Sequence, residues 1–529
     1  MCGILGLLLT NKTFSHKEIM KAFMSLQNRG PDNYDDLDII KKRIIIGFEQ
    51  FWFGFHRLCI NDLSQGGNQP FEVGRLILMC NGEIYNHKEL KKKFNIKCNS
   101  NSDCEIIAHM YNKVGIDITI QELDGVFAFV LYDMDKNLLY LVRDRVGVRP
   151  LFYSMDIDFN FAFSSEAKAL ELLNLKNISQ LAGGNYIKIN ITHKLVTVKN
   201  YWMLPSKPSE NFRATLHINI REFLEDAIKK RLISDRPIGC LLSGGLDSSV
   251  IASILVKHGI KSTFSIGFKD SIDLKYARIV ADYLDTNHHE LVLTYDEALK
   301  AIPEVIYAIE SYDITTVRAS IPMYLLCKYI KNNYKETVIF SGEGSDELMG
   351  GYLYFHKAPS GDAMFQESKR LVEELPDYDV LRADRCTASN GLELRVPFLD
   401  KEFLEFCMSI DGKYRKPKDN MEKYYLRKAF EGELPESVLW RLKDGMSDGV
   451  GSKEKPWYKY IQELAEKEVT DKELKEYKNI LPKPVTKEGI YYYKIYKGKF
   501  PNVVKLTHYW MPKWVGECDD PSGRVVEIN

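Results

Sequence analysis

Two different patterns of apolar residues meet near residue 205 of this 529-residue chain. Before that point, short apolar segments such as residues 76–80 and 126–132 alternate with turn signals, which is typical of an antiparallel sheet. After it, apolar strands alternate with helical stretches, as where residues 237–242 are followed by residues 248–258. This alternation predicts crossover connections and a parallel sheet covered by helices. We therefore expect two domains of different architecture.

The first domain, residues 1–204, is expected to be an α+β layered domain with a mostly antiparallel sheet. Further strands are predicted at 138–142, 151–153, 160–163 and 186–189, and helices at 16–28 and 103–114. A linker is predicted at residues 204–210, LPSKPSE, because two prolines stand among polar residues. The second domain, residues 205–529, is expected to be α/β, with further strands at 262–268, 289–293 and 337–340 and a mainly helical part beyond residue 360.

Composition excludes several classes of function. Lysine and arginine total 72 against 73 acidic residues, so no large basic surface is available to hold nucleic acid or an anionic membrane. No apolar run approaches the ~20 residues of a membrane helix, and no basic segment precedes the apolar N-terminus as in a signal peptide. The ten cysteines include no CxxC pair, which argues against a disulfide framework or a structural zinc site and favours a cytoplasmic protein.

The sharpest local signal is the sequence LLSGGLDSS at residues 241–249. An apolar strand runs into two glycines and then directly into a helix, so backbone N–H groups and the helix dipole face an anion. The motif is not a Walker loop, because GxxxxGK[ST] occurs nowhere in the chain. The alternative is a glycine-rich turn without a ligand.

A second loop, SGEGSDE at residues 341–347, also follows a predicted strand of the parallel sheet. Ligands of such sheets lie at the carboxyl ends of the strands, so Asp247 and Asp346 are expected on one rim beside the anion loop. Two carboxylates next to a triphosphate suit Mg²⁺. The alternative is a solvated acidic turn, which leaves unexplained why two glycine–acid loops end neighbouring strands.

At this point the residues resemble a known family. SGGLDSS resembles the pyrophosphate loop of ATP pyrophosphatases, which adenylate a substrate and release pyrophosphate. Together, several motifs resemble the glutamine-hydrolysing asparagine synthetases of eukaryotic type: SGEGSDE, TTVRAS, YFHKAP, YDVLRADR, LELRVPFLD and HYWMPKW. The resemblance implies that ATP is bound by Leu242, Ser243, Gly244, Gly245, Asp247, Ser248, Ile266, Ser341 and Gly342. It also implies that Glu343 stands at the reacting centre and that Arg382 and Lys443 neutralise phosphate charge.

Cys2 follows the initiator Met1, and a small second residue allows removal of the methionine. The exposed α-amine, with an ordinary pKa of about 7.7–8.0, would then stand beside the thiol as its base. A thiolate made in this way is a nucleophile. The alternative is a buried cysteine that packs at the start of a strand.

The motifs CGI, RGPD (29–32), HRLCI (56–60), NGEIYN (81–86) and SDCE (102–105) resemble the glutaminase domain of class II amidotransferases. The resemblance implies an Ntn-hydrolase-like αββα sandwich. An amide attacked by the thiolate develops an oxyanion, which the Asn81 side chain and the Gly82 N–H would stabilise. Arg57 suits the carboxylate of glutamine and Asp103 its ammonium, unless both are surface charges. The full set expected around glutamine is Arg57, Leu58, Cys59, Ile60, Asn61, Asn81, Gly82, Glu83 and Asp103.

The expected activity has two parts. Residues 1–204 would hydrolyse glutamine, and residues 205–529 would use ATP and Mg²⁺ to activate aspartate as β-aspartyl-AMP, which ammonia converts to asparagine. Glutamine, aspartate and ATP are the expected partners, with no nucleic acid or membrane. The sequence does not determine the oligomeric state, and a homodimer is one candidate. One alternative is an enzyme resembling β-lactam synthetases, and another is a non-catalytic regulator. Cys2 and the segments YDVLRADR and LELRVPFLD argue against the first alternative, and the presence of Cys2, Asp247 and Glu343 argues against the second.

Overall fold

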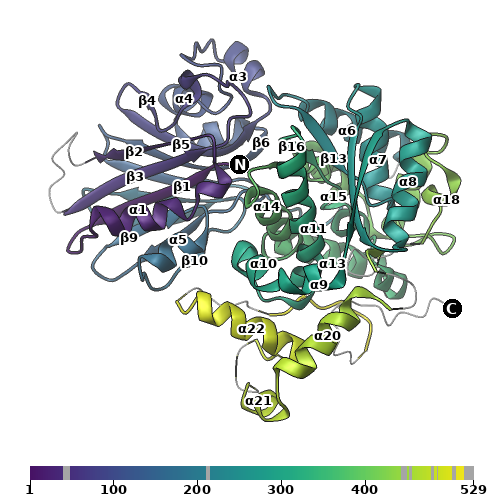
Figure 1. Ribbon diagram of the computed structural model, residues 1–529. Helices are drawn as coiled ribbons and strands as arrows, with labels where there is room; N and C mark the ends of the chain where they lie inside the picture. The colour runs from purple at the N-terminus through teal and green to yellow at the C-terminus, as the bar shows by residue number, and fades with distance from the viewer. Residues whose placement is uncertain are drawn as a thin grey trace.

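The computed structural model describes residues 1–39, 48–209, 215–442, 449–451, 455–477, 480, 482–484, 486–502 and 508–516. Two antiparallel sheets form the N-terminal part of the chain (Figure 1). The first, in the order β10-β8-β9-β1-β3-β2, contains β1 (Gly3–Leu9), β2 (Asn33–Asp38), β3 (Gln50–Arg57), β8 (Phe152–Met155), β9 (Phe161–Ser164) and β10 (Ser179–Gln180). The second, in the order β12-β11-β7-β6-β5-β4, contains β4 (Phe71–Val73), β5 (Leu76–Ile84), β6 (Gly125–Asp133), β7 (Leu138–Arg143), β11 (Asn185–Asn190) and β12 (Leu195–Asn200).

Alternation of side chains along the strands stacks these sheets into a sandwich. On β1, Ile4 and Leu8 face the second sheet and pack in one buried cluster with Met79 of β5. Leu5 and Leu7, on the other face, pack under α1 (His16–Met24) and α5 (Ala167–Leu172). The outer face of the second sheet packs with α4 (Ile106–Glu122), beside α3 (His87–Lys93). The predicted αββα arrangement is confirmed.

The second half of the chain contains the predicted parallel sheet. Its order is β15-β14-β13-β16-β17, and all neighbouring strands are parallel. The strands are β13 (Ile238–Leu241), β14 (Ser262–Phe268), β15 (Asn287–Leu293), β16 (Val338–Phe340) and β17 (Glu393–Arg395). Helices that the later argument uses are α7 (Leu246–Lys257), α8 (Ile272–Leu284), α11 (Ile314–Asn333), α14 (Asp379–Ala388) and α17 (Tyr424–Ala429). The others are α6 (Leu216–Lys230), α9 (Tyr295–Lys300), α10 (Ile302–Ile309), α12 (Ser345–Met349), α13 (Gly361–Glu374), α15 (Lys401–Ser409), α16 (Gly412–Arg415), α18 (Glu436–Leu439), α20 (Trp457–Glu468), α21 (Asp471–Glu476) and α22 (Lys487–Lys499).

Several predicted boundaries were wrong. The helix expected at 103–114 begins later, at Ile106. Its predicted end at residue 114 coincides with a kink at Gly115, where the backbone is non-helical (φ 76°, ψ 175°), and α4 resumes beyond the kink to Glu122. The helix expected at 16–28 stops at Met24 and is followed by a separate 3₁₀ turn, η1 (Gln27–Arg29). The strand expected at 289–293 begins two residues earlier, at Asn287.

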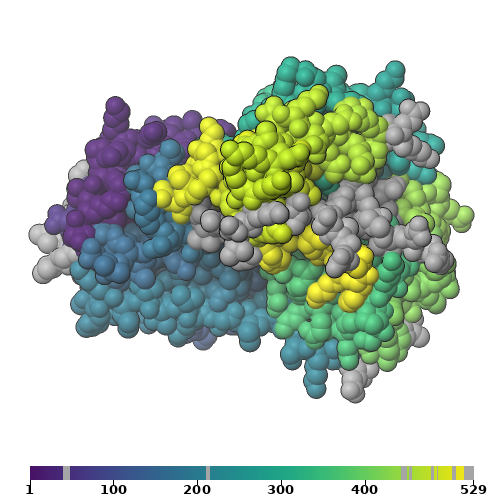
Figure 2. Space-filling view, turned by 90° about the horizontal axis from the view of Figure 1, so that it is seen from below, coloured from purple at the N-terminus to yellow at the C-terminus, as the bar shows by residue number. Residues whose placement is uncertain are grey.

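The two halves meet at the N-terminus of the chain, which lies between them in Figure 1. Met1 and Leu58 of the first half share one buried cluster with Leu394 of the second. The C-terminal helices α20 and α22 lie along one face of the molecule, and the yellow end of this region reaches the sandwich in Figure 2. There Asn502 donates a 2.8 Å hydrogen bond to Glu171. No helix among the described residues is both long and apolar enough to cross a membrane.

Candidate active sites

A small cavity of about 30 Å³ lies beside Cys2, where β1 begins and β3 ends. All the residues predicted to surround glutamine line it except Cys59. Cys59 lies beyond the end of β3 at Arg57, and its backbone N–H donates to Asp32 (2.8 Å). The cavity is lined by Met1, Cys2, Arg57, Leu58, Ile60, Asn61, Gly67, Gln69, Cys80, Asn81, Gly82, Glu83, Ser102, Asp103, Cys104, Arg149 and Glu393.

Cys2 and Asn81 form the centre of this cavity. The backbone N–H of Cys2 donates to Oδ1 of Asn81 (2.8 Å), and its Sγ lies 3.5 Å from the backbone nitrogen of Leu58. Burial raises the pKa of the Cys2 thiol. Among the described residues, the buried Nδ2 of Asn81 has no hydrogen-bond partner. A buried donor without a partner is costly, so this amide is suited to an oxyanion that forms during reaction.

Gly82 stands next to Asn81 on β5, where the neighbouring strand approaches closely. A Cβ added at Gly82 would lie 2.2 Å from the carbonyl oxygen of Val126 on β6. Glycine is therefore required at this position for packing as well as for any role of its N–H group.

Arg57 and Asp103 both reach the cavity but are already engaged. The guanidinium of Arg57 donates to the carbonyl of Ser64 (2.8 Å) and to Oδ1 of Asn68 (2.7 Å), so it braces the loop that follows β3. Asp103 accepts a hydrogen bond from the backbone N–H of Ile84 (2.6 Å), and burial raises its pKa. Both side chains are in place to face a bound amino acid, and Arg57 must exchange some of these partners to do so.

Met1 covers the Cys2 backbone in this structure. The methionine is 2 % exposed, and burial lowers the pKa of its α-amine to about 6. Its sulfur contacts the guanidinium of Arg149. Removing Met1 would both widen the cavity and place the chain's amine on Cys2.

A second cavity, of about 420 Å³, lies where β13 and β16 end. Of the residues predicted to bind ATP or its products, Ser243, Gly245, Asp247, Ser248, Ser341, Gly342, Glu343, Asp346 and Arg382 line it. Leu242, Gly244 and Ile266 do not line it, and Lys443 lies outside the described residues. The cavity wall also includes four residues of the motifs TTVRAS, YDVLRADR and HYWMPKW to which no role was assigned: Thr315, Thr316, Asp379 and Trp510. Four further residues of the wall lie in none of the motifs: Tyr352, Lys423, Arg427 and Arg441.

The glycine loop between β13 and α7 turns tightly against α8. Gly244 has a φ of 70°, and a Cβ there would lie 2.3 Å from the backbone nitrogen of Ala277. Because Gly244 makes this turn, the hydroxyls of Ser243 and Ser248 come within 3.1 Å of each other in front of α7. This combination of hydroxyls and a helix N-terminus is typical of a phosphate site.

The two carboxylates predicted for Mg²⁺ do converge, but on a lysine. Nζ of Lys423 lies 2.7 Å from Asp247 and 2.5 Å from Asp346, and its side chain is 2 % exposed. Oxygens that meet around one ammonium have the charge and spacing for a cation, so this pair fits a divalent ion if Lys423 moves aside. Lys423 has a left-handed φ of 55° just before α17, in a segment with no sequence motif.

Glu343 lies on the same wall and is held by Arg382. The guanidinium donates to Oε2 of Glu343 (2.7 Å) and contacts Asp379 (2.8 Å) on its other side. Burial raises the pKa of Glu343, and the charge of Arg382 opposes that rise.

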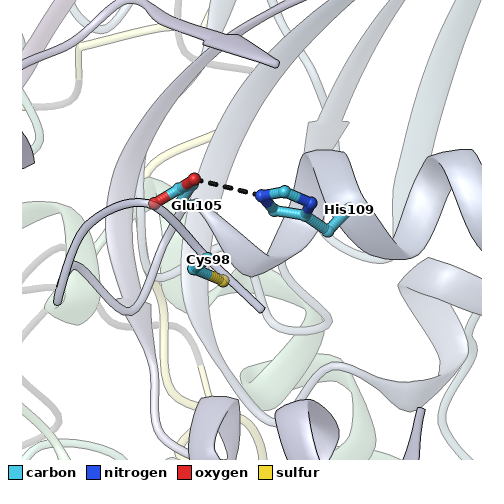
Figure 3. Close-up of side chains that lie close together, drawn as sticks. All are labelled: Cys98, Glu105 and His109. Atoms are coloured by element: carbon cyan, nitrogen blue, oxygen red, sulfur yellow. Dashed lines mark hydrogen bonds and ion pairs between the residues drawn. The ribbon is translucent and has the colours of Figure 1, made fainter. Parts of the chain in front are cut away.

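A second group of possible metal ligands lines neither cavity (Figure 3). Cys98, Glu105 and His109 place ligand atoms within 4.8 Å of one another. Each oxygen of Glu105 already has two partners: the backbone of Asn99 (2.9 Å) and His109 (3.0 Å) for one, and the backbone (2.7 Å) and hydroxyl (2.6 Å) of Ser100 for the other. Glu105 thus ties the preceding loop to α4, and we assign this group a structural role.

Comparison with known proteins finds a matching family model for each half of the chain. The family model for the glutamine amidotransferase domain matches residues 1–202, and that for asparagine synthase matches residues 219–375 and 358–510. The glutamine-hydrolysing asparagine synthetase of Rattus norvegicus is 43% identical over 562 residues, covering 99% of this chain and 98% of its own. Those of Homo sapiens (99% and 98%) and Gallus gallus (100% and 99%) are each 42% identical. The chain therefore belongs to the family of glutamine-hydrolysing asparagine synthetases.

Proposed function

We propose that this chain makes asparagine from aspartate, taking nitrogen from glutamine and energy from ATP. The observation that carries the proposal is that one chain contains two cavities, each lined by the side chains that one of the two reactions needs. One has a cysteine beside an unpaired buried amide donor, and the other has a glycine-rich anion loop facing two carboxylates. We place the division between the glutaminase and synthetase domains after residue 204.

In the first cavity, the Cys2 thiolate attacks the glutamine amide once Met1 has been removed. The α-amine of Cys2 accepts the thiol proton, and the amide of Asn81 stabilises the oxyanion with its free Nδ2. Ammonia leaves with the proton held by the amine, and water then hydrolyses the thioester to release glutamate. Arg57 and Asp103 hold the two charged ends of the substrate.

In the second cavity, the loop from Ser243 to Ser248 holds the β- and γ-phosphates while the β-carboxylate of aspartate attacks the α-phosphate. Pyrophosphate leaves, and ammonia attacks the acyl-adenylate to give asparagine and AMP. Arg382 neutralises phosphate charge and orients Glu343, which accepts a proton from the attacking ammonia. Lys443, which lies outside the described residues, is proposed to neutralise phosphate charge as well.

Asp247 and Asp346 would hold Mg²⁺, which supplies positive charge to the triphosphate. For this to happen, the ammonium of Lys423 must leave the carboxylates, and the arriving phosphates are a suitable new partner for it. The cytoplasmic location, the homodimer and the absence of nucleic-acid or membrane partners stay predictions from the sequence.

The test is Cys2→Ala, assayed with each nitrogen donor. Synthesis from glutamine should be lost and synthesis from ammonium salts retained, because the thiol is needed only to release ammonia. Product analysis should find AMP, pyrophosphate and asparagine in equal amounts. Equal loss with both donors would contradict the assignment of two separate centres, and ADP as the main product would contradict adenylation.

A further inference from the structure

Helix α14 (Asp379–Ala388) belongs to the second half of the chain and lies beside the N-terminus (Figure 1). Its Arg382 lines the nucleotide cavity and holds Glu343 at 2.7 Å. Asp384 follows two positions later and, at 100° per residue, points to the opposite side of the helix. There it accepts a hydrogen bond from Arg29 of the glutaminase domain (3.0 Å). One turn of α14 thus contacts the nucleotide cavity through Arg382 and the glutaminase domain through Asp384.

Arg29 connects Asp384 to the nucleophile. Nε of Arg29 donates to the backbone carbonyl of Cys2 (2.9 Å), while Nη1 contacts Glu166 (2.7 Å) and Asp384 (3.0 Å). Arg29 and Asp384 are 1 % exposed and Glu166 is 2 % exposed. A guanidinium buried so deeply is held only by its partners. The two carboxylates, one from each domain, therefore set the direction in which Nε points.

The groups around Asp384 keep it ionised. Burial alone would raise its pKa, but Arg29, Arg385 and Arg149 together hold the pKa below its usual value. Arg149 also comes from the glutaminase domain, and its Nη1 lies 3.4 Å from Asp384. The synthetase domain thus contributes an ionised carboxylate, Asp384, that Arg29 links to the backbone of Cys2.

We propose that Asp384, although it belongs to the synthetase domain, is a positioning residue of the glutaminase reaction. It orients Arg29, which fixes the carbonyl of Cys2 and so the direction of the Cys2 amine and thiol. The inference rests on the proposed role of Cys2 as nucleophile. The proposal gives the synthetase domain a role in the glutaminase reaction, in addition to its use of the ammonia that this reaction releases.

The other role for such a contact is to hold the two domains together, and kinetics separate the two roles. A displaced nucleophile lowers kcat, because a misplacement of about 1 Å costs about 100-fold in rate. Glutamine binding depends on Arg57 and Asp103, which lie on other elements, so the KM for glutamine should change little. A general loosening of the domain contact would instead raise KM together with the loss of kcat.

The experiment measures glutaminase kcat and KM in the full-length chain with Asp384→Asn, Asp384→Glu and a matched control. The control is Glu488→Gln, which breaks an equally buried ion pair with Arg318 (2.6 Å, both side chains 2 % exposed) that makes no contact with Cys2. We expect Asp384→Asn to lower kcat by about 10- to 100-fold with KM within about 3-fold of wild type. Asp384→Glu should recover part of the loss, and Glu488→Gln should stay within about 2-fold. Ammonia-dependent synthesis on the same samples reports that the second domain is folded.

Should Asp384→Asn fail to fold, Arg29→Lys takes its place with the same expectation, since a lysine ammonium lacks the fixed fork of donors with which the guanidinium spans Glu166, Asp384 and the Cys2 carbonyl. A wild-type kcat in Asp384→Asn, an equal loss in Glu488→Gln, or no recovery in Asp384→Glu would each overturn the proposal. Cys2→Ala, measured in parallel, distinguishes a failure of the positioning role from a failure of the proposed function. If Cys2→Ala retains glutaminase activity, the proposed function fails as well. If Cys2→Ala loses glutaminase activity while Asp384→Asn keeps the wild-type kcat, only the positioning role is refuted.

Discussion

Individual residues with distinctive chemistry were predictable where a motif carried them. Cys2, Asn81, Asp247 and Glu343 all line a cavity, as their motifs indicated. Lys423 was missed because nothing in its neighbours marks it. Its ammonium reaches the acidic pair only because the backbone adopts a left-handed turn before α17, a conformation that no local pattern for lysine predicts.

Glu343 gives a prediction at the scale of one side chain. Glu343→Gln keeps the size of the side chain but removes the base, so asparagine formation should slow by about 10²- to 10⁴-fold while ATP binding changes little. Because burial raises the pKa of Glu343, the carboxylate is lost at a higher pH than in an ordinary glutamic acid. Ammonia-dependent synthesis by the wild type should therefore decline as the pH falls through this raised value.

The measurement is the initial rate of asparagine formation against pH, at constant free ammonia. Glutaminase activity serves as the control, since Cys2 lies in the other domain. A Glu343→Gln variant with a near-normal rate would show that Glu343 only shapes the turn, and the base would then be sought near Asp346 and Arg382.

Among the elements, strands were predicted more accurately than helix ends. Residues 138–142 match β7 closely because apolar side chains alternate there between two buried faces. The predicted end of the helix at residue 114 matches the kink at Gly115, but the prediction missed that helical structure resumes beyond it, where Ile116 and Ile120 pack in the same buried cluster as the sheet. Tertiary contacts of this kind are not contained in a local sequence pattern.

The segment 508–516 contains the motif HYWMPKW, but the sequence did not predict where this motif lies in the fold. The N–H of Trp510 donates to the buried carboxylate of Asp313 (2.9 Å), which also accepts from Thr316 at the start of α11. The Trp510 ring packs against Tyr352, with ring centroids 5.5 Å apart, and lines the nucleotide cavity. This part of the tail is therefore a wall of the synthetase site.

Trp510→Ala should lower kcat/KM for ammonia-dependent synthesis by about 10-fold, since a lost aromatic contact costs about 0.5–1.5 kcal/mol in addition to its buried area. Steady-state kinetics with varied aspartate and ATP would measure the effect. Trp514→Ala is the matched control, because this ring packs on Tyr354 and does not line the cavity. Equal losses in the two variants would mean that the tail acts only through stability.

At the scale of the whole molecule, the sequence predicted two domains but not how they join. The junction contains buried charges, and their partners lie far apart along the chain. Glu310, in the left-handed region with φ of 57°, accepts from the backbone N–H groups of Ala167 (2.9 Å) and Lys168 (2.7 Å) at the start of α5. It thereby caps a helix of the other domain.

Glu310→Ala should therefore destabilise the protein by about 3 kcal/mol, because two buried N–H groups lose a charged acceptor. Calorimetry should show an earlier unfolding transition, with the glutaminase domain separating from the rest. Asp135→Ala removes an exposed ion pair with Arg75 and should cost no more than about 1 kcal/mol. An unchanged transition in Glu310→Ala would show that α5 is satisfied without the second domain.

The contact of α14 with Arg29 also limits how such enzymes can be recombined. A chimera that joins the glutaminase half of this chain to the synthetase half of a distant relative inherits Arg29 from one parent and whatever stands at position 384 from the other. Unless that residue is an acid, the graft leaves a buried arginine short of a counter-charge directly beneath the nucleophile. Shuffled libraries should therefore cross over only between parents that match at both positions, even though the two positions lie far apart in the chain.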